Sequence, residues 1–116
     1  MQRQFFDGKI HRATVTDAQI DYPGSITIDP VLLKAADIYP HEKVLIANLT
    51  NGARIESYCI PGEPGSGDVC LNGGAAKHGK AGDIVIIISF TLLEESEIAG
   101  HTPKVVHVNE KNQIVS

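Results

Sequence analysis

Short β-branched segments run along the whole chain, and glycine, proline or asparagine separates most of them from the next. Residues 10–16 and 26–28 alternate apolar and polar side chains, as strands with one buried face do. Further strands are expected over residues 44–49, 53–60, 69–71, 84–90, 105–108 and 113–115, the last two as a hairpin. Many short strands with turns between them favour a closed sheet over a sheet covered by helices. We therefore expect a mainly β fold, a small β-barrel.

Three local patterns add detail to this expectation. Asn51-Gly52 lies between two predicted strands and suits a type I′ hairpin turn, because both residues tolerate positive φ. Residues 84–90 are apolar except for Ser89, which is typical of a strand buried on both faces. Asp29-Pro30 resembles a helix N-cap followed by proline at the first helical position, so a short helix should begin there.

Composition and charge exclude several classes of protein. The 116 residues suffice for one domain with a single core, and 42% hydrophobic and 21% charged residues indicate an ordered globular chain. The formal net charge is −4 and there is no lysine- or arginine-rich run, so the chain lacks the basic surface that nucleic-acid binding requires. The longest apolar run, residues 84–88, is too short to span a membrane, and no signal peptide is recognised. We expect a cytoplasmic protein without nucleic-acid or membrane partners.

The cysteines and histidines do not form a recognisable metal or redox motif. Cys59 and Cys70 lie outside any CxxC pattern, in segments predicted to be strands, which indicates two buried thiols in a reducing compartment. The histidines lack the spacing of metal ligands, so no metal site is predicted. They are His11, His41, His78, His101 and His107.

The stretch from Gly73 to Ala81 has three possible interpretations. From Gly74 it comes within one residue of the phosphate-binding GxxxxGK[ST] motif, but Ala81 has no hydroxyl for Mg²⁺ and no βα unit surrounds it. The stretch also suits a turn of helix followed by a loop. A third interpretation keeps the helix and uses the backbone N–H groups at its start to hold a carboxylate, which small residues allow to approach.

The segment Tyr22-Pro23-Gly24-Ser25 has two interpretations. Proline presets φ at the second turn position and glycine allows positive φ at the third, so the segment suits an ordinary hairpin turn. Alternatively, the Ser25 hydroxyl attacks the Gly24 carbonyl, which no Cβ shields, and the amide becomes an ester. Loss of the Ser25 α-proton then expels the Gly24 carboxylate and leaves dehydroalanine, which hydrolyses to a pyruvoyl group. The turn alone does not decide between the two.

Four blocks of sequence, in order and at matching spacing, resemble the pyruvoyl-dependent aspartate 1-decarboxylases. They are residues 8–16 with Tyr22 and Gly24-Ser25; Asn51-Gly52 with Arg54, Ser57 and Tyr58; residues 72–76; and residues 82–87. Each block alone is weakly specific, but all four in register from about residue 9 to residue 90 identify the chain as a member of this family.

The resemblance implies a fold, an assembly and a reaction. The fold would be a six-stranded double-psi β-barrel with short helices, and the assembly a homotetramer with active sites between subunits. The enzyme would remove the α-carboxylate of L-aspartate to give β-alanine and CO2 for pantothenate and coenzyme A synthesis. Self-cleavage at Gly24-Ser25 would divide the chain into residues 1–24 (β chain) and 25–116 (α chain). The resulting covalent pyruvoyl group would replace pyridoxal phosphate, and no metal would be needed.

The resemblance also implies roles for individual residues. Ser25 would become the pyruvoyl group that forms a Schiff base with substrate, and Tyr58 would be the proton donor. Substrate binding would fall to Lys9 and Arg54, which bind carboxylate, and to Ser57 and the backbone of Gly73, Gly74 and Ala75. Self-processing would involve Gly24, Ser25, Ser57 and Asn72.

The chain departs from the family at two of these positions. The family usually has threonine at the position of Ser57 and alanine at that of Gly74. Ser57 keeps the hydroxyl but lacks the methyl group that restricts χ1, and Gly74 loosens the backbone. Neither change removes a functional group, so we expect effects on rate and affinity only. A second class of function stays open: a non-catalytic β-barrel binding or regulatory module, in which Gly24-Ser25 is only a turn.

Overall fold

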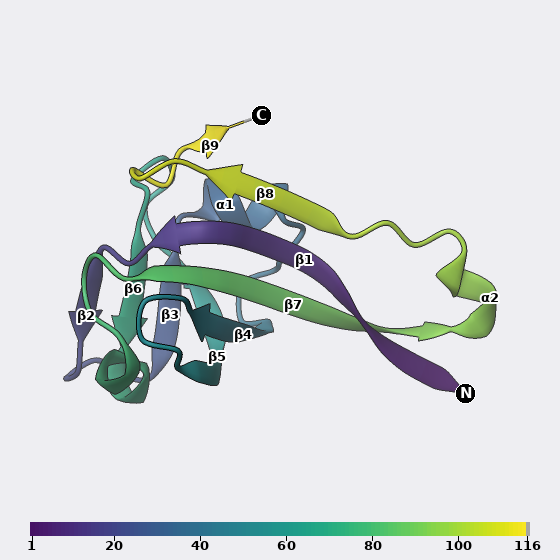
Figure 1. The fold of residues 1–116 in the computed structure, drawn as a ribbon, viewed down its shortest axis with the longest axis horizontal. Coiled ribbons are helices and arrows are strands. Elements are labelled where there is room, and N and C mark those ends of the chain that lie inside the picture. Colours follow the sequence, from purple (N-terminus) through teal and green to yellow (C-terminus); the bar gives the residue numbers. More distant parts are fainter. Residues whose placement is uncertain (116) are drawn as a thin grey trace.

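Strands account for much of the chain that the computed structural model describes, residues 1–115 (Figure 1). They are β1 (Gln2–Thr14), β2 (Asp17–Gln19), β3 (Ser25–Ile28), β4 (Lys43–Asn48), β5 (Arg54–Pro61), β6 (Val69–Asn72), β7 (Ile84–Glu94), β8 (Lys104–Val108) and β9 (Ile114–Val115). The helices are α1 (Pro30–Ala35), the 3₁₀ helix η1 (Gly73–His78) and α2 (Glu95–Ile98). Within the described residues, no helix is long and apolar enough to cross a bilayer. The predicted mainly β fold is confirmed.

The strands pair in the order β2-β6-β3-β5-β4-β7-β1-β8-β9, with parallel and antiparallel neighbours. The first and second strands are nearly continuous, and the link between them bonds both to the residue before β7 and to β6, which are separated in this series. The Val15 N–H donates to the Asp83 carbonyl at 2.8 Å, and the Thr16 N–H donates to the Val69 carbonyl at 2.8 Å. One stretch of chain therefore pairs with β7 through its first part and with β6 through its last.

The core is aliphatic and lies on the inner face of these strands. Ile10 on β1 pairs with Ile87 on β7, which in turn pairs with Ile46 on β4, and all three side chains are buried. Because the chain contains no tryptophan, isoleucine, valine and leucine fill the core. Burying each such side chain stabilises the fold by about 1.5–3 kcal/mol.

Asp29 begins α1 as predicted and also ties the loop before β6 to the end of β3. Its carboxylate accepts hydrogen bonds from the backbone N–H groups of Val31 at 2.9 Å, Gly65 at 3.0 Å and Gly67 at 2.9 Å. Burial would raise the pKa of this carboxyl, but the three N–H donors outweigh burial and lower the pKa below its usual value. The charged form of Asp29 therefore stabilises the end of β3.

The predicted type I′ turn at Asn51-Gly52 is wrong. Gly52 has φ +81°, but Asn51 is not among the residues with positive φ, and a type I′ turn requires both. The side-chain oxygen of Asn48 accepts hydrogen bonds from the N–H groups of Thr50 at 2.9 Å and Asn51 at 3.1 Å. These bonds hold a longer loop between β4 and β5. The hairpin itself, and the last hairpin of β8 and β9, are confirmed.

Two predictions of burial also need correction. In β7 Val85, Ile87 and Ser89 are buried, whereas the outward side chains of Ile86 and Ile88 are only half-buried, so one face is in the core rather than both. The reason is that side chains alternate between the two faces of a strand, and only those of one face, Val85 and Ile87, belong to the core cluster. Cys59 is buried as predicted, but Cys70 is only half-buried; both thiols are free.

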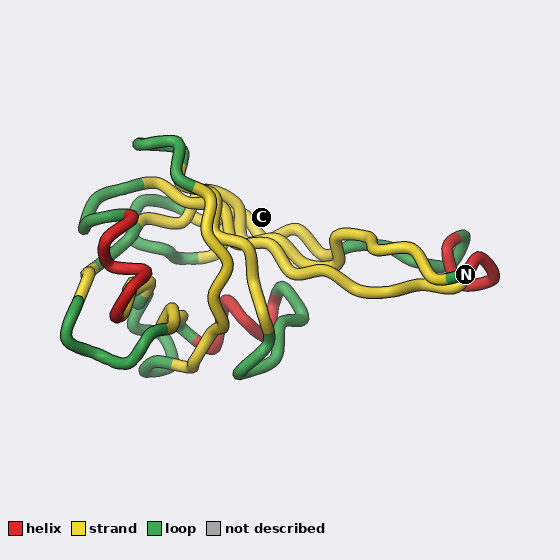
Figure 2. The backbone as a smooth tube through the Cα atoms, turned by 90° about the horizontal axis from the view of Figure 1, so that it is seen from below, coloured by secondary structure: helices red, strands yellow, loops and turns green. Residues whose placement is uncertain are grey.

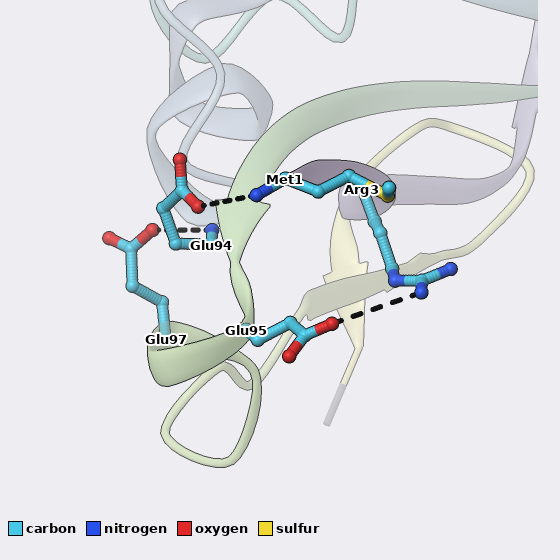
Figure 3. A network of polar contacts seen from close by, with 5 residues as sticks. All are labelled: Met1, Arg3, Glu94, Glu95 and Glu97. Carbon is cyan, nitrogen blue, oxygen red and sulfur yellow. Dashed lines mark hydrogen bonds and ion pairs between the residues drawn. The ribbon is translucent and has the colours of Figure 1, made fainter.

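The ends of β1 and β7 form a two-stranded arm that extends away from the rest of the molecule (Figure 2). Gln2 to Phe6 pair with Glu94 to Phe90 along this arm. At its tip the N-terminal ammonium lies 3.4 Å from Glu94, and Arg3 lies 3.9 Å from Glu95 (Figure 3). Such exposed ion pairs contribute little to stability. Strand β1 begins eight residues before the predicted strand, because polar residues within 2–9 obscure the pattern.

Candidate active site

A cleft of about 580 Å³ opens beside the start of β3. Parts of β3, β5 and η1 form its walls. The residues that line it are Gly24, Ser25, Ile55, Glu56, Ser57, Tyr58, Gly74, Ala75 and His78. Six of the predicted site residues, from three separate blocks of sequence, are therefore brought together: Gly24, Ser25, Ser57, Tyr58, Gly74 and Ala75.

Ser25 is held at the inner side of the cleft by Asn72. The two residues pair directly across β3 and β6, and their exposed fractions are 2% for Ser25 and 1% for Asn72. The Asn72 side-chain amide donates to Ser25 Oγ at 2.9 Å and to Thr27 Oγ1 at 2.9 Å. Burial makes such bonds orient a group strongly, since an unpaired polar atom there would be costly. The side-chain oxygen of Ser25 is thus held in one orientation by Asn72.

The carbonyl end of the Asn72 amide is fixed as well. Cys70 Sγ donates to Asn72 Oδ1 at 3.2 Å. Burial, and after it the charges of Asp17 and Asp68, raise the pKa of the Cys70 thiol, so the sulfur keeps its proton and remains a donor. All the polar atoms of the Asn72 side chain are therefore engaged, and its N–H groups face Ser25 and Thr27.

The turn that carries the Gly24-Ser25 bond rests on Gly73. Gly73 has φ +60°, and a Cβ on it would lie 2.6 Å from the Tyr22 carbonyl oxygen and 2.8 Å from both the Cα and the nitrogen of Gly24. Only glycine permits this approach. By contrast, a Cβ on Gly24 would meet nothing within 4 Å. The cleft side of the Gly24-Ser25 bond is open, and its other side is supported.

Strand β5 presents alternate side chains to the two sides of the sheet. Ser57 is half-buried and pairs with Val44 in the core, whereas Tyr58 is 43% exposed and pairs with Lys43. Both line the cleft. The site therefore combines a half-buried hydroxyl with an accessible phenol in the same cleft as Gly24 and Ser25.

Lys9 and Arg54 do not line this cleft. The Lys9 ammonium lies over the Phe6 ring, 5.0 Å from its centroid, and Arg54 is exposed at the start of β5. The two predicted carboxylate-binding cations are thus not brought to Ser25 within one chain. Glu56, which does line the cleft, is paired with Lys43 at 3.2 Å.

His78 lines the cleft but was not predicted as a site residue. Residues 73–78 form a turn of helix, η1, followed by a loop, as two of the three interpretations of residues 73–81 expect. In a 3₁₀ helix, residues three apart share a face, so His78 stands on the same side as Ala75. The spacing from Ala75 would indicate this only if the helix were known to be of the 3₁₀ type, which the sequence did not show.

Comparison with known proteins agrees with the arrangement of the site. The sequence matches the family model described as aspartate decarboxylase over residues 1–115. Proteins named aspartate 1-decarboxylase from Listeria monocytogenes serovar 1/2a and Neisseria meningitidis serogroup C are 57% and 59% identical over 114 residues, 98% of this chain and 90% of each relative. One from Thermoanaerobacter pseudethanolicus is 51% identical over 116 residues, 100% of this chain and 99% of that protein. With a match over nearly its whole length, the chain belongs to the aspartate decarboxylase family.

Proposed function

We propose that the protein removes the α-carboxylate of L-aspartate, releasing CO2 and β-alanine for pantothenate and coenzyme A synthesis. The observation that carries this proposal is the cleft at Ser25. There, residues from three separate family blocks surround a buried serine hydroxyl that Asn72 holds at 2.9 Å. A hairpin turn without chemistry would not require a buried, oriented hydroxyl directly after a glycine with open space around its Cα.

The first step in this proposal is self-cleavage between Gly24 and Ser25. Ser25 Oγ attacks the Gly24 carbonyl carbon, the C–N bond breaks, and the amide becomes an ester with a free amine. Loss of the Ser25 α-proton then breaks the Cβ–Oγ bond and releases the Gly24 carboxylate. Addition of one water and loss of one ammonia leave a pyruvoyl group at residue 25. The hydroxyl of Ser57 would polarise the Gly24 carbonyl during the attack.

The surroundings of residue 25 fit such a group. Gly73 leaves room at the back of the turn, and Gly74 and Ala75 carry no bulky side chains on the opposite wall. A pyruvoyl group would accept the electron pair that remains on Cα when CO2 leaves. In other enzymes a pyridoxal cofactor performs this task. The chain's own residues have other tasks: the backbone of Gly73, Gly74 and Ala75 would contact substrate, and Tyr58 would return a proton to Cα.

We further propose a homotetramer whose active sites lie between subunits, with Lys9 and Arg54 as the carboxylate-binding cations. The position of Lys9 outside the cleft of its own chain supports this, because another copy could supply it. The arm also leaves apolar side chains exposed: Phe6 by 37%, Phe90 by 39% and Leu92 by 56%. Exposed apolar side chains of this kind are typical of protein interfaces.

The continuity of β1 and β2 supports the six-stranded double-psi β-barrel. Counting that stretch once, the series β1/β2, β6, β3, β5, β4 and β7 returns to its starting strand. A biosynthetic role and free thiols are consistent with the cytoplasm as the compartment.

A denaturing gel and intact mass measurement of the purified protein test the proposal. We expect two fragments, residues 1–24 and 25–116, with one water gained and one ammonia lost overall. Activity should survive dialysis without pyridoxal phosphate, and borohydride with aspartate should attach substrate to residue 25. A chain that stays whole and inactive would indicate the alternative, a binding module, and an intact chain that decarboxylates aspartate would rule out the pyruvoyl mechanism.

Co-expression of two inactive variants tests the shared site. If a neighbouring subunit supplies Lys9, Lys9→Ala and Ser25→Ala chains should form mixed assemblies in which some sites hold both a cleaved Ser25 and an intact Lys9. We expect activity from the mixture and none from either variant alone. A mixture without activity would place Lys9 in its own chain's site or outside the site.

A further inference from the structure

We infer that Thr27 is a positioning residue for the reaction that follows self-cleavage. Its hydroxyl oxygen, together with the Cys70 thiol, holds the Asn72 amide in place after the Ser25 hydroxyl has been consumed. One N–H of Asn72 therefore stays directed at residue 25. The inference rests on the proposed function and adds to it a residue that lies outside the four family blocks.

Four polar side chains on one face of β3 and β6 bond to one another. They are Ser25, Thr27, Cys70 and Asn72. Ser25 pairs with Asn72 across the two strands, and the pair two residues further along β3 is Thr27 with Cys70. The Asn72 amide donates to Ser25 Oγ and to Thr27 Oγ1, both at 2.9 Å, and its oxygen accepts from Cys70 Sγ at 3.2 Å. Three separate bonds thus orient this amide.

Self-cleavage would remove one of these three bonds. In the proposed reaction the Cβ–Oγ bond of Ser25 breaks, and Oγ leaves as part of the Gly24 carboxylate. The Asn72 N–H that donated to Oγ then loses its acceptor, in a residue that is 1% exposed. A buried amide with an unpaired N–H would turn toward another acceptor unless other bonds held it. The bonds with Thr27 and Cys70 do not involve residue 25, so they remain.

Thr27 is itself fixed well enough to hold Asn72. Its backbone lies between two neighbouring strands, β5 and β6, and pairs with both. A Cβ on Gly62 would lie 3.0 Å from Thr27 Cγ2, so the backbone of Gly62 packs closely against the threonine methyl group. Because a β-branched side chain has few χ1 rotamers, this packing also fixes the hydroxyl on the side of Asn72.

A donor that survives self-cleavage would serve decarboxylation. As CO2 leaves, an electron pair moves toward the group at residue 25, and negative charge develops there. An N–H already directed at that position stabilises the transition state more than it stabilises bound substrate. Its contribution therefore appears in kcat rather than in KM.

Kinetics of Thr27→Val test the inference, because valine has the shape of threonine but no hydroxyl. A positioned donor at a developing negative charge contributes about 10²- to 10³-fold to kcat. Thr27→Val loosens this donor without removing it, so we expect kcat per cleaved chain to fall about 10-fold, with KM within about twofold. Self-cleavage should be nearly normal, because Ser25 Oγ still holds Asn72 in the uncut chain.

Two further variants separate the hydroxyl from packing. Thr27→Ser keeps an acceptor for Asn72 and should restore most of kcat. Thr14→Val removes the hydroxyl of another half-buried strand threonine, outside the cleft, and should leave cleavage and turnover unchanged. An unchanged kcat for Thr27→Val would overturn the inference. Equal slowing of cleavage and turnover would do the same, as would a Thr27→Ser chain that is no more active than Thr27→Val.

The Ser25→Ala chain gives a readout without turnover, because it lacks the hydroxyl and should not cleave. Selective ¹⁵N labelling of asparagine lets NMR follow the Asn72 side-chain amide, and loss of the signal in Asn72→Ala identifies it. We expect its motion to be as restricted as that of the backbone, and to increase when Thr27→Val is added. Equal motion with and without Thr27→Val would overturn the inference. A wild-type chain that fails to cleave would count against the proposed function, and the NMR comparison would still decide whether Thr27 holds Asn72.

Discussion

The two halves of the candidate site differ in how completely one chain builds them. Around Ser25, which is 2% exposed, the Asn72 side chain is fully hydrogen-bonded and Gly73 supports the turn. On the substrate side, Tyr58 is 43% exposed, and Lys9 lies against Phe6 rather than in the cleft. The half that would make the pyruvoyl group is thus assembled within one chain, whereas the half that would use it is open at the surface. Making the group and using it should therefore be separable by mutation.

The largest effect is expected from Ser25→Ala. Without the hydroxyl no ester can form, so we expect no fragments and no CO2 release, while the fold persists because only one oxygen is lost. Gel analysis and a CO2 assay on the same preparation measure both. Ser96→Ala, in the exposed helix α2, serves as the matched control and should cleave normally. Cleavage of Ser25→Ala at the same bond would show that another group attacks Gly24.

Tyr58→Phe should separate self-cleavage from decarboxylation. The ring and its packing remain, so cleavage at Gly24-Ser25 should be normal, but loss of a positioned acid typically lowers the rate about 10²- to 10⁴-fold. Fragment yield and kcat measured together test this, with Tyr39→Phe as a control on a tyrosine outside the cleft. Near-normal turnover by Tyr58→Phe would mean that water or another residue donates the proton. Tyr58 would then not separate self-cleavage from turnover.

The sequence predicted the features that local patterns determine and missed those that depend on contacts between distant residues. Most of the strands, α1 and the gathering of Gly24, Ser25, Ser57 and Tyr58 follow from local patterns and from the spacing of family blocks, whereas β2 was not predicted. His78 was missed because its position in the cleft depends on a 3₁₀ helix ending at a fixed point, which long-range bonds from Asn48 and Asn51 determine. The arm was missed because its polar residues pair with a distant strand rather than follow a local pattern.

Asp29, at the end of β3, should make the free energy of unfolding sensitive to low pH. Its pKa is lowered in the folded state, so its stabilising effect is full above the unfolded value of about 3.9 and is lost as the pH falls through the lower folded value. Asp29→Asn should cost about 1–3 kcal/mol at neutral pH, and the difference from wild type should shrink below about pH 4. Urea unfolding of Ser25→Ala backgrounds at several pH values measures this, with the exposed Glu110→Gln as control. If the difference in free energy of unfolding were the same at all these pH values, the charge of Asp29 would not contribute to stability.

The smallest effect is expected at Cys70, which touches the site only through Asn72. Cys70→Val leaves Asn72 Oδ1 without its donor, and we expect self-cleavage to slow several-fold, about the effect of one weak hydrogen bond. Cys70→Ser keeps a donor and should restore the rate. Time courses of fragment appearance, with thermal unfolding midpoints as a check on the fold, measure this. Equal slowing in both variants would assign the effect to packing and leave the orientation of Asn72 to its bonds with Ser25 and Thr27.

Residues 1–24, which cleavage would release as a separate chain, supply β1 and β2, and β1 lies between β7 and β8 in the middle of the sheet. Once the bond is cut, unfolding would let this piece diffuse away, and recovery would require two molecules to meet. Refolding would then depend on protein concentration, and thermal inactivation of the cleaved protein would be irreversible. The uncut precursor would refold from a single chain. The cleaved protein would therefore keep a structure that its two fragments cannot readily rebuild. Thermal unfolding would be reversible before cleavage and irreversible after it.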